Sequence, residues 1–288
     1  MINDKNSFSR RNFIAKTTLA VGAFGAGSIF SSQALGSSAP ENPKPNEGKV
    51  AIVTGSSRGI GEAIAKRLAA DGFKITINCV VNRDLAENVA RDIKAAGGEA
   101  TWLQSDVRKP EAVRELFDVT EEAFGGVDVV VNNAGVMKLA SFSEMTDEDF
   151  NYVMDTNLKG GFNVLREAAR RVRDGGRIIS TSSSITLLKL PTYGPYAASK
   201  AALQIYSSAL AKEVGGRGIS VNALSPGVVN TTLFTDGKTE EQIEGFAKRT
   251  PHGRIGEPED IAAVVSALCS PDGWWVNGQT VFANGGLV

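Results

Sequence analysis

The segment Thr54-Gly55-Ser56-Ser57-Arg58-Gly59-Ile60-Gly61 decides the fold, because it joins a short apolar run to a helical pattern that begins at Gly61. Glycines let the chain turn tightly and bring backbone N–H groups close to a ligand. The N-terminus of the following helix favours negative charge. The segment therefore predicts a phosphate-binding loop between the first strand and the first helix, with Gly-x-x-x-Gly-x-Gly spacing.

Outward from this loop, short β-branched runs alternate with longer stretches of helical periodicity, which is typical of parallel strands joined by crossover helices. The predicted strands are Lys49 to Thr54, Lys74 to Cys79, Ala100 to Gln104, Val127 to Val131, Arg177 to Ser182, Ser220 to Leu224 and Thr280 to Ala283. The predicted helices are Gly61 to Ala70, Asp84 to Ala96, Pro110 to Phe124, Asp147 to Val172, Tyr196 to Val214 and Pro258 to Leu268. We expect an α/β protein with a single doubly wound Rossmann-type domain, a parallel sheet of about seven strands, and helices on both faces.

The composition narrows the function classes. Apolar residues make up 42% of the 288 residues, charged residues 22%, and the net charge is -1, so there is no basic field for nucleic acid. Cys79 and Cys269 lack metal-ligand spacing, and His252 is the single histidine, which argues against a metal site and a serine hydrolase. Two buried free thiols are favoured over a disulfide, and His252 is interpreted as a loop residue.

The N-terminal segment differs in character from the rest. The run Ser9-Arg10-Arg11-Asn12-Phe13-Ile14-Ala15-Lys16, followed by an apolar stretch to Phe30, resembles a twin-arginine export signal. We expect a signal peptide at residues 1–39, a linker at 40–47 and the catalytic domain at 48–288. Cleavage after Ala34 or after Ala39 stays open.

Export would place the mature protein in the periplasm, with no stable membrane anchor after processing. A signal that is not used would leave it in the cytoplasm. The alternatives are a disordered basic tail and an uncleaved anchor, but the apolar stretch is short and glycine-rich for a spanning helix.

Beyond the loop, further motifs follow in a recognisable order. They are Asp106-Val107, Asn132-Asn133-Ala134-Gly135, Asn157, Ser183, Tyr196-Ala-Ala-Ser-Lys200 and Pro226-Gly227. With this set, the chain after the linker resembles the short-chain dehydrogenase/reductase family, and among its members 3-oxoacyl-carrier-protein reductases and polyhydroxynaphthalene-type ketone reductases. The resemblance implies hydride transfer between a nicotinamide cofactor and a carbonyl or alcohol.

Tyr196 and Lys200 lie four residues apart at the start of a predicted helix and share one face. A free phenol has a pKa near ~10, and a nearby ammonium lowers it, so the pair suits Tyr196 as general acid and base. The resemblance also implies that Lys200 binds the nicotinamide ribose. The alternative is that Tyr196 and Lys200 lie on an ordinary solvent-exposed helix face without a catalytic role.

Ser183 lies thirteen positions before Tyr196, and the resemblance implies that its hydroxyl holds the substrate oxygen, where charge develops in the reaction. Strand alternation puts Ser182 and Ser184 on the opposite face. For Asn157 the resemblance implies a backbone position that holds a water linking Lys200 to solvent. An ordinary surface asparagine is the alternative.

The resemblance further implies a cofactor site that these residues form together. Its members are Gly55, Ser57, Arg58, Gly59, Ile60, Gly61, Asp106, Val107, Asn133, Ala134, Gly135, Tyr196, Lys200, Pro226, Gly227, Val229 and Thr231. The second strand ends near Cys79 without the acid that would bind a ribose 2′-hydroxyl, whereas Arg58, with Asn82 or Arg83, offers donors for a 2′-phosphate. NADP(H) is therefore expected, and a permissive site would also accept NAD.

The substrate end is less defined. The pattern of residues Asn230 to Arg254 indicates a lid or a substrate loop with a short helix. An apolar pocket is expected from Leu187, Leu188, Leu190, Tyr193 and Phe234. We expect an oxidoreductase acting on a small ketone, aldehyde or alcohol, in a homotetramer or homodimer formed through the long central helices, as the resemblance implies. The rival is a non-catalytic NADP(H)-binding redox sensor or assembly partner.

Overall fold

The computed structural model describes residues 46–288, in which seven strands run parallel in one sheet of spatial order β3-β2-β1-β4-β5-β6-β7. The strands are β1 (Val50–Val53), β2 (Lys74–Cys79), β3 (Ala100–Gln104), β4 (Val127–Asn132), β5 (Val172–Thr181), β6 (Ser220–Pro226) and β7 (Thr280–Ala283). The order reverses between β1 and β4, the point at which doubly wound sheets open a crevice for ligands. The expected α/β fold with a seven-stranded parallel sheet is confirmed.

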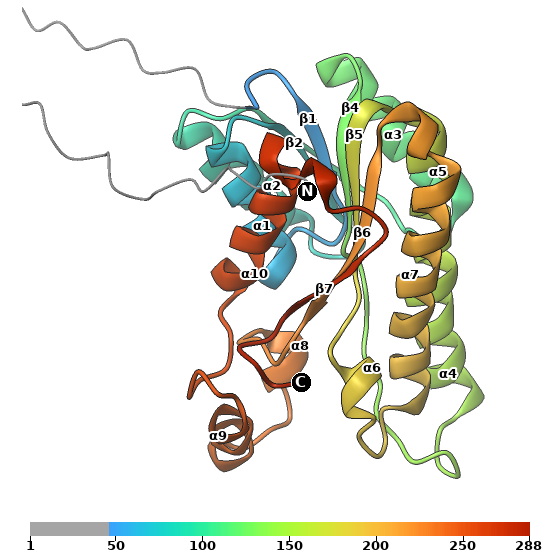
Figure 1. Cartoon of the computed structure of the whole chain (residues 1–288), viewed down its shortest axis with the longest axis vertical. Coiled ribbons are helices and arrows are strands. Elements are labelled where there is room, and N and C mark those ends of the chain that lie inside the picture. Colours follow the sequence, from blue (N-terminus) through green and yellow to red (C-terminus); the bar gives the residue numbers. More distant parts are fainter. Residues whose placement is uncertain (1–45) are drawn as a thin grey trace, which may run out of the picture. The chain divides into compact units, whose positions relative to one another are not determined.

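Helices cover both faces of the sheet (Figure 1). On one face lie α1 (Gly59–Ala70), α2 (Arg83–Ala95) and α10 (Pro258–Cys269); on the other lie α3 (Pro110–Phe124), α5 (Gly161–Arg171) and α7 (Gly194–Glu213). The remaining helical segments are α4 (Asp147–Val153), α6 (Ile185–Leu188), α8 (Thr232–Thr235), α9 (Glu240–Arg249), the π-helical segment Met154–Gly160, and the 3-10 turns Gly215–Arg217 and Pro271–Trp275. No helix within residues 46–288 combines the length and the apolar character needed to cross a membrane.

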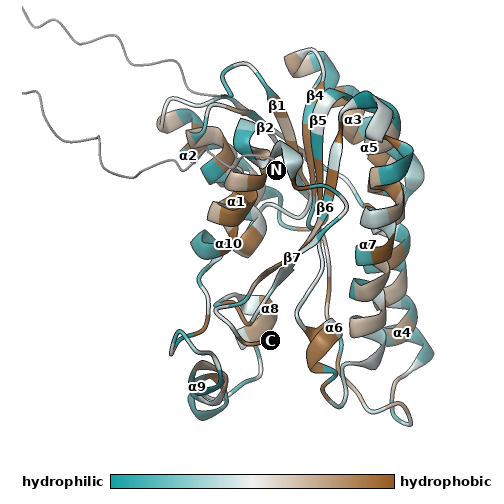
Figure 2. Cartoon of the chain, in the orientation of Figure 1, coloured by the Kyte–Doolittle hydropathy of each residue, from teal (hydrophilic) through white to brown (hydrophobic). Residues whose placement is uncertain are grey.

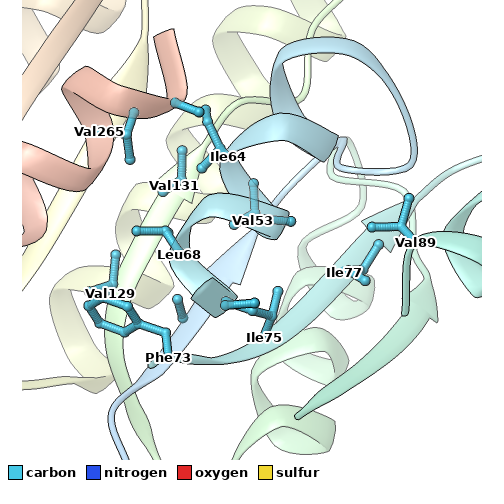
Figure 3. Close-up of a cluster of buried hydrophobic side chains, with 14 of the residues drawn as sticks. Val53, Ile64, Leu68, Phe73, Ile75, Ile77, Val89, Val129, Val131 and Val265 are labelled. Carbon is cyan, nitrogen blue, oxygen red and sulfur yellow. The ribbon is translucent and has the colours of Figure 1, made fainter. Parts of the chain in front are cut away.

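Two apolar cores hold these layers together. Ala51 and Val53 of β1 face α1 and α10, whereas Ile52 between them faces the opposite layer. Figure 3 shows the first core, in which Val53 and its neighbours meet Ile64 and Leu68 of α1 and Val265 of α10. All residues of β1 are buried, which explains why its apolar run is continuous and not alternating. Each fully buried Ile or Leu contributes roughly 1.5–3 kcal/mol.

One long helix predicted from the sequence is divided in the structure. The stretch Asp147 to Val172 forms α4, then the π-helical Met154–Gly160, then α5, and β5 begins at Val172. The wide turn brings Gly160 and Gly161 against neighbouring side chains, since an added Cβ would lie 2.8 Å from Val107 Cγ2 and 2.7 Å from Leu203 Cδ2, respectively. Apolar periodicity does not reveal a single widened turn, which explains the wrong prediction.

Candidate active site

One cavity of about 580 Å³ opens at the carboxyl ends of the strands, because its walls come from the segments that follow β1 to β6. It brings together the site residues predicted from the sequence, except Asn157, the alternative phosphate donor Arg83 and the pocket candidate Leu187. The lining includes the catalytic candidates Ser183, Tyr196 and Lys200, and the cofactor candidates Gly55, Ser57, Arg58, Gly59, Ile60, Gly61, Asp106, Val107, Asn133, Ala134, Gly135, Pro226, Gly227, Val229 and Thr231.

The glycine loop leaves no room for side chains at its centre. A Cβ on Gly61 would lie 2.4 Å from the carbonyl oxygen of Gly55 and 2.6 Å from Asn133 Nδ2. That amide donates to the carbonyl oxygens of Thr54 and Gly55, and so locks the loop to the segment after β4. No side chain of the described residues caps the start of α1, whose first residues line the cavity. The uncapped N–H groups and the helix dipole suit an anionic group such as a diphosphate.

The end of the cavity next to the last residues of β2, called the nucleotide end, carries basic side chains. β2 ends at the buried Cys79, and no acid stands there. Arg58 is exposed and lines the cavity together with Asn82, and no carboxylate in residues 46–288 pairs with Arg58. The sequence left Arg83 open as a further donor, but its guanidinium packs 5.7 Å from the Trp102 ring centroid and does not line the cavity.

Asp106 and Arg108 form a bidentate ion pair in the same wall, with Arg108 Nη2 at 2.7 Å from Asp106 Oδ2. Hydrogen bonding by Arg108 holds the pKa of Asp106 below its usual value. Sequence reasoning singled out Asp106 but missed Arg108, whose signal was its position two residues after that acid. Cys79 and Cys269 are both free and buried, as expected.

Ser183, Tyr196 and Lys200 line the cavity together. Tyr196 and Lys200 are 8% and 4% exposed, and Lys200 Nζ donates to the carbonyl oxygen of Thr181 at 2.8 Å and lies 5.9 Å from the Tyr196 ring centroid. Burial lowers the pKa of Lys200 to about 8. Since the ammonium has no carboxylate partner among the described residues, it is held by backbone alone.

The phenol behaves differently from the sequence prediction. Burial raises the pKa of Tyr196 to about 12, and the nearby Tyr193 adds to the rise, while the Ser183 hydroxyl opposes it. The expected lowering of the Tyr196 pKa by Lys200 is therefore wrong. Desolvation of the phenolate outweighs the attraction of an ammonium whose hydrogen bond goes to Thr181.

Asn157 lies behind the cavity wall and does not line it. Its amide donates to Val136 O at 2.9 Å and accepts from Val136 N at 2.8 Å, and it also donates to Ser199 Oγ. Ser199 in turn donates to the carbonyl oxygen of Tyr196. Asn157 thus joins the segment after β4 to the helix that carries Tyr196.

The serines beside Ser183 have other partners. The Ser182 hydroxyl donates to the carbonyl oxygen of Lys200, and the Ser184 hydroxyl donates to that of Ser225. Both residues are buried, whereas Ser183 is half-buried. All three serines follow β5 and line the cavity, so strand alternation does not separate them. The Ser183 oxygen accepts from Ile185 N at 3.3 Å, and its proton is left for a ligand.

The substrate end of the cavity is apolar. Leu188, Leu190, Tyr193 and Phe234 line it as expected, but Leu187 is 54% exposed and does not. Phe246 packs edge-on against Phe234, with ring centroids 5.3 Å apart. Sequence reasoning missed several lining residues, of which Val136 and Met137 directly follow a predicted motif: Val136, Met137, Tyr152, Thr156, Ile185, Leu233 and Phe246.

The lid, defined as residues 230–256, leaves and rejoins the domain at one place. Val229 and Gly256 form a parallel bridge, and Asn230 N donates to the Gly256 carbonyl oxygen at 2.8 Å. Its helix α9 has no buried residue and is mostly hydrophilic in Figure 2. The expected short helix of this segment is present as α9, with α8 as a second helical turn. His252 lies in this segment and does not line the main cavity.

Comparisons with known proteins agree with this geometry. Residues 55–288 match a family model described as enoyl-(acyl carrier protein) reductase. A short-chain type dehydrogenase/reductase of Picea abies is 43% identical over 84% of this chain and 93% of its own length. An NADPH-dependent aldehyde reductase-like chloroplastic protein of Arabidopsis thaliana is 42% identical over 88% of this chain and 98% of its own.

A solved structure gives the same result. A short-chain dehydrogenase from Burkholderia cenocepacia J2315 in complex with NADP superposes with a TM-score of 0.80 and 37% identity, covering 84% of this chain and 99% of that one. The fold is therefore shared over nearly the whole domain. The chain belongs to the short-chain dehydrogenase/reductase family of oxidoreductases.

Proposed function

We propose that this oxidoreductase interconverts a ketone or aldehyde and an alcohol, with NADP(H) as cofactor. The observation that carries the proposal is the placement of Ser183, Tyr196 and Lys200 in the same cavity as the glycine loop. A hydroxyl, a phenol and an ammonium that converge on one space can hold a carbonyl oxygen and exchange its proton.

The cofactor assignment rests on the nucleotide end of the cavity. The uncapped start of α1 would hold the diphosphate, and Arg58 with Asn82 would hold a 2′-phosphate, since no acid at Cys79 opposes it. The related proteins named above that use NADPH or bind NADP support this choice. When bound, the nicotinamide supplies or accepts a hydride.

The protein's own residues handle the oxygen and its proton. A Tyr196 pKa of about 12 keeps the phenol protonated at neutral pH, so Tyr196 is the proton donor in reduction. Ser183 donates to the substrate oxygen as negative charge develops there, and the Lys200 ammonium stabilises the phenolate that remains. In the opposite direction the same groups take up the proton of an alcohol.

The substrate is proposed to be a neutral carbonyl compound with an apolar body. The walls around Ser183 come from leucine, tyrosine and phenylalanine side chains, and the cationic Arg58 and Arg108 lie at the nucleotide end. Among the described residues that line the cavity, Lys200 is the one cation near the reacting oxygen, and the reaction itself uses it.

Tyr196→Phe tests the reaction. The variant keeps the ring but removes the proton donor, so NADPH-dependent carbonyl reduction should fall by roughly 10²- to 10⁴-fold while the NADPH dissociation constant stays within about twofold. The measurement is nicotinamide absorbance with a panel of ketones, aldehydes and one enoyl thioester. Unchanged carbonyl reduction in the variant would refute the assignment of Tyr196.

The wild-type panel separates the classes of function. Consumption of NADPH with a ketone or aldehyde supports the reductase, whereas consumption with the enoyl thioester alone would replace it by an enoyl reductase. Tight NADPH binding without turnover on any compound would favour the sensor or assembly partner.

We infer two further properties that stand beside this chemistry. The apolar side chains Phe162 and Ile205, 46% and 67% exposed on α5 and α7, support a homodimer or homotetramer through these helices. The twin-arginine-like segment, which lies outside the described residues, supports export to the periplasm. Light scattering of the wild type and of Ile205→Glu tests the oligomer, and a monomeric wild type would refute it. Cell fractionation with N-terminal sequencing tests export, and a cytoplasmic, uncleaved chain would refute it.

A further inference from the structure

Gln204 stands one helical turn after Lys200 on α7 and does not line the cavity. Its side-chain nitrogen lies 3.0 Å from Ser182 Oγ, 3.0 Å from Thr186 Oγ1 and 3.2 Å from Ser225 Oγ. These three hydroxyls belong to the residue that follows β5, to α6 and to β6. One amide thus connects three segments around Ser183, which neither the resemblance nor the catalytic motifs single out.

The direction of these hydrogen bonds follows from the protons available. The Ser182 hydroxyl donates to the Lys200 carbonyl oxygen at 2.8 Å, and the Thr186 hydroxyl donates to the Ser183 carbonyl oxygen at 3.0 Å. Each hydroxyl has a single proton, so both oxygens must accept from Gln204, whose NH₂ offers two donors. The amide orientation is fixed by its surroundings.

The result is a bridge with two arms. One arm runs from Gln204 through Ser182 to the backbone of Lys200, and the other runs through Thr186 to the backbone of Ser183. The arms tie the turn that carries Ser183 to the helix that carries Tyr196 and Lys200. Backbone hydrogen bonds join the same turn to β6, through Ser182 N to Leu224 O and Ser184 N to Pro226 O, but they do not reach α7.

We propose that Gln204 is a positioning residue, which holds the Ser183 hydroxyl in register with the Tyr196 phenol so that both reach one carbonyl oxygen. This inference rests on the proposed carbonyl chemistry. Two donors on separate elements must meet a single atom, and misplacement by about 1 Å reduces turnover by up to about 10²-fold.

The test compares Gln204→Leu with Gln204→Glu. The leucine removes both donors, and the glutamate keeps the shape but places acceptors against hydroxyls whose protons point elsewhere. Both variants should lose about ten- to a hundredfold in kcat with NADPH affinity within about twofold. Gln204→Glu should recover part of its kcat at acid pH, where a protonated carboxyl regains one donor, and Gln204→Leu should not.

A second comparison uses Thr186→Val, which removes one arm without changing side-chain shape. It should lose less than Gln204→Leu, and the double variant should be no worse than Gln204→Leu alone, because the threonine arm starts at the amide. Fully additive losses, or a folded Gln204→Leu variant with wild-type kcat, would refute the positioning role.

Crystal structures of wild type and Gln204→Leu make the inference independent of turnover. The Ser183 hydroxyl should move relative to Tyr196 in the variant, and an unmoved hydroxyl would contradict the proposal even in an active enzyme. If the wild type reduces no carbonyl while the Ser183 hydroxyl does move, the proposed function fails and the structural bridge stands.

Discussion

The two ends of the cavity are built by different means. At the nucleotide end, the glycine loop and the start of α1 present backbone, and side chains lock that backbone in place, as Asn133 does. At the substrate end, Phe234 and Phe246 reach the cavity from a lid whose helix α9 has no buried residue. The crowded backbone of the glycine loop can adopt one conformation, whereas the side chains of a lid with no buried residue in α9 can adopt many. The nucleotide end therefore depends mainly on backbone, whereas the substrate end depends on side chains, of which Phe234 and Phe246 come from the lid.

Gly61→Ala at the nucleotide end should have the largest effect on stability and NADPH binding. The new Cβ would meet the Gly55 carbonyl oxygen at 2.4 Å, so the variant should lose about 1–3 kcal/mol of stability and bind NADPH up to about 100-fold more weakly. Gly245→Ala in α9 is the matched control: nothing lies within 4 Å, and it should gain about 0.5–1 kcal/mol. Urea unfolding and NADPH titration measure both, and equal tolerance of the two alanines would abolish the contrast.

The pH dependence probes Lys200, at the junction of the two ends. Burial gives its ammonium a pKa of about 8, so the charged form is present below that pH and is lost above it. Since Tyr196 keeps its proton up to a pKa of about 12, carbonyl reduction should decline about tenfold per pH unit above 8 because of Lys200. The residual activity of Lys200→Arg, whose guanidinium stays charged, should lack this decline. A decline that is the same in both enzymes would assign it elsewhere.

Phe234→Ala is the smallest expected effect and is confined to the lid. It removes half of the Phe234–Phe246 aromatic pair, so KM for an apolar ketone should rise about five- to tenfold while NADPH affinity is unchanged. Leu187→Ala provides the control, because Leu187 is exposed and outside the cavity. An equal rise in KM for both variants would show that the lid residue does not contact substrate.

The same difference explains what the sequence could predict. The seven strands and the glycine loop were predictable, because each depends on local pattern and spacing. The placement of Ser183, Tyr196 and Lys200 in one cavity was predictable through the family resemblance. The pKa of Tyr196 was not, since burial depends on how Tyr193 and the surrounding elements pack. Arg83 turned to Trp102, and the turn at Asn157 widened, for tertiary reasons that no local pattern carries.

The two ends of the lid lie side by side at Val229 and Gly256, so the segment between them can be replaced as a unit. Its two ends meet in one parallel bridge, reinforced by hydrogen bonds from Asn230 to Gly256 and from Gly256 to Val228. A segment whose ends already touch can change in length or sequence with little loop-closure entropy and without disturbing the sheet. Grafting the lid of a relative between these anchor points should therefore replace the contribution of Phe234 and Phe246 to the cavity and leave its other walls in place.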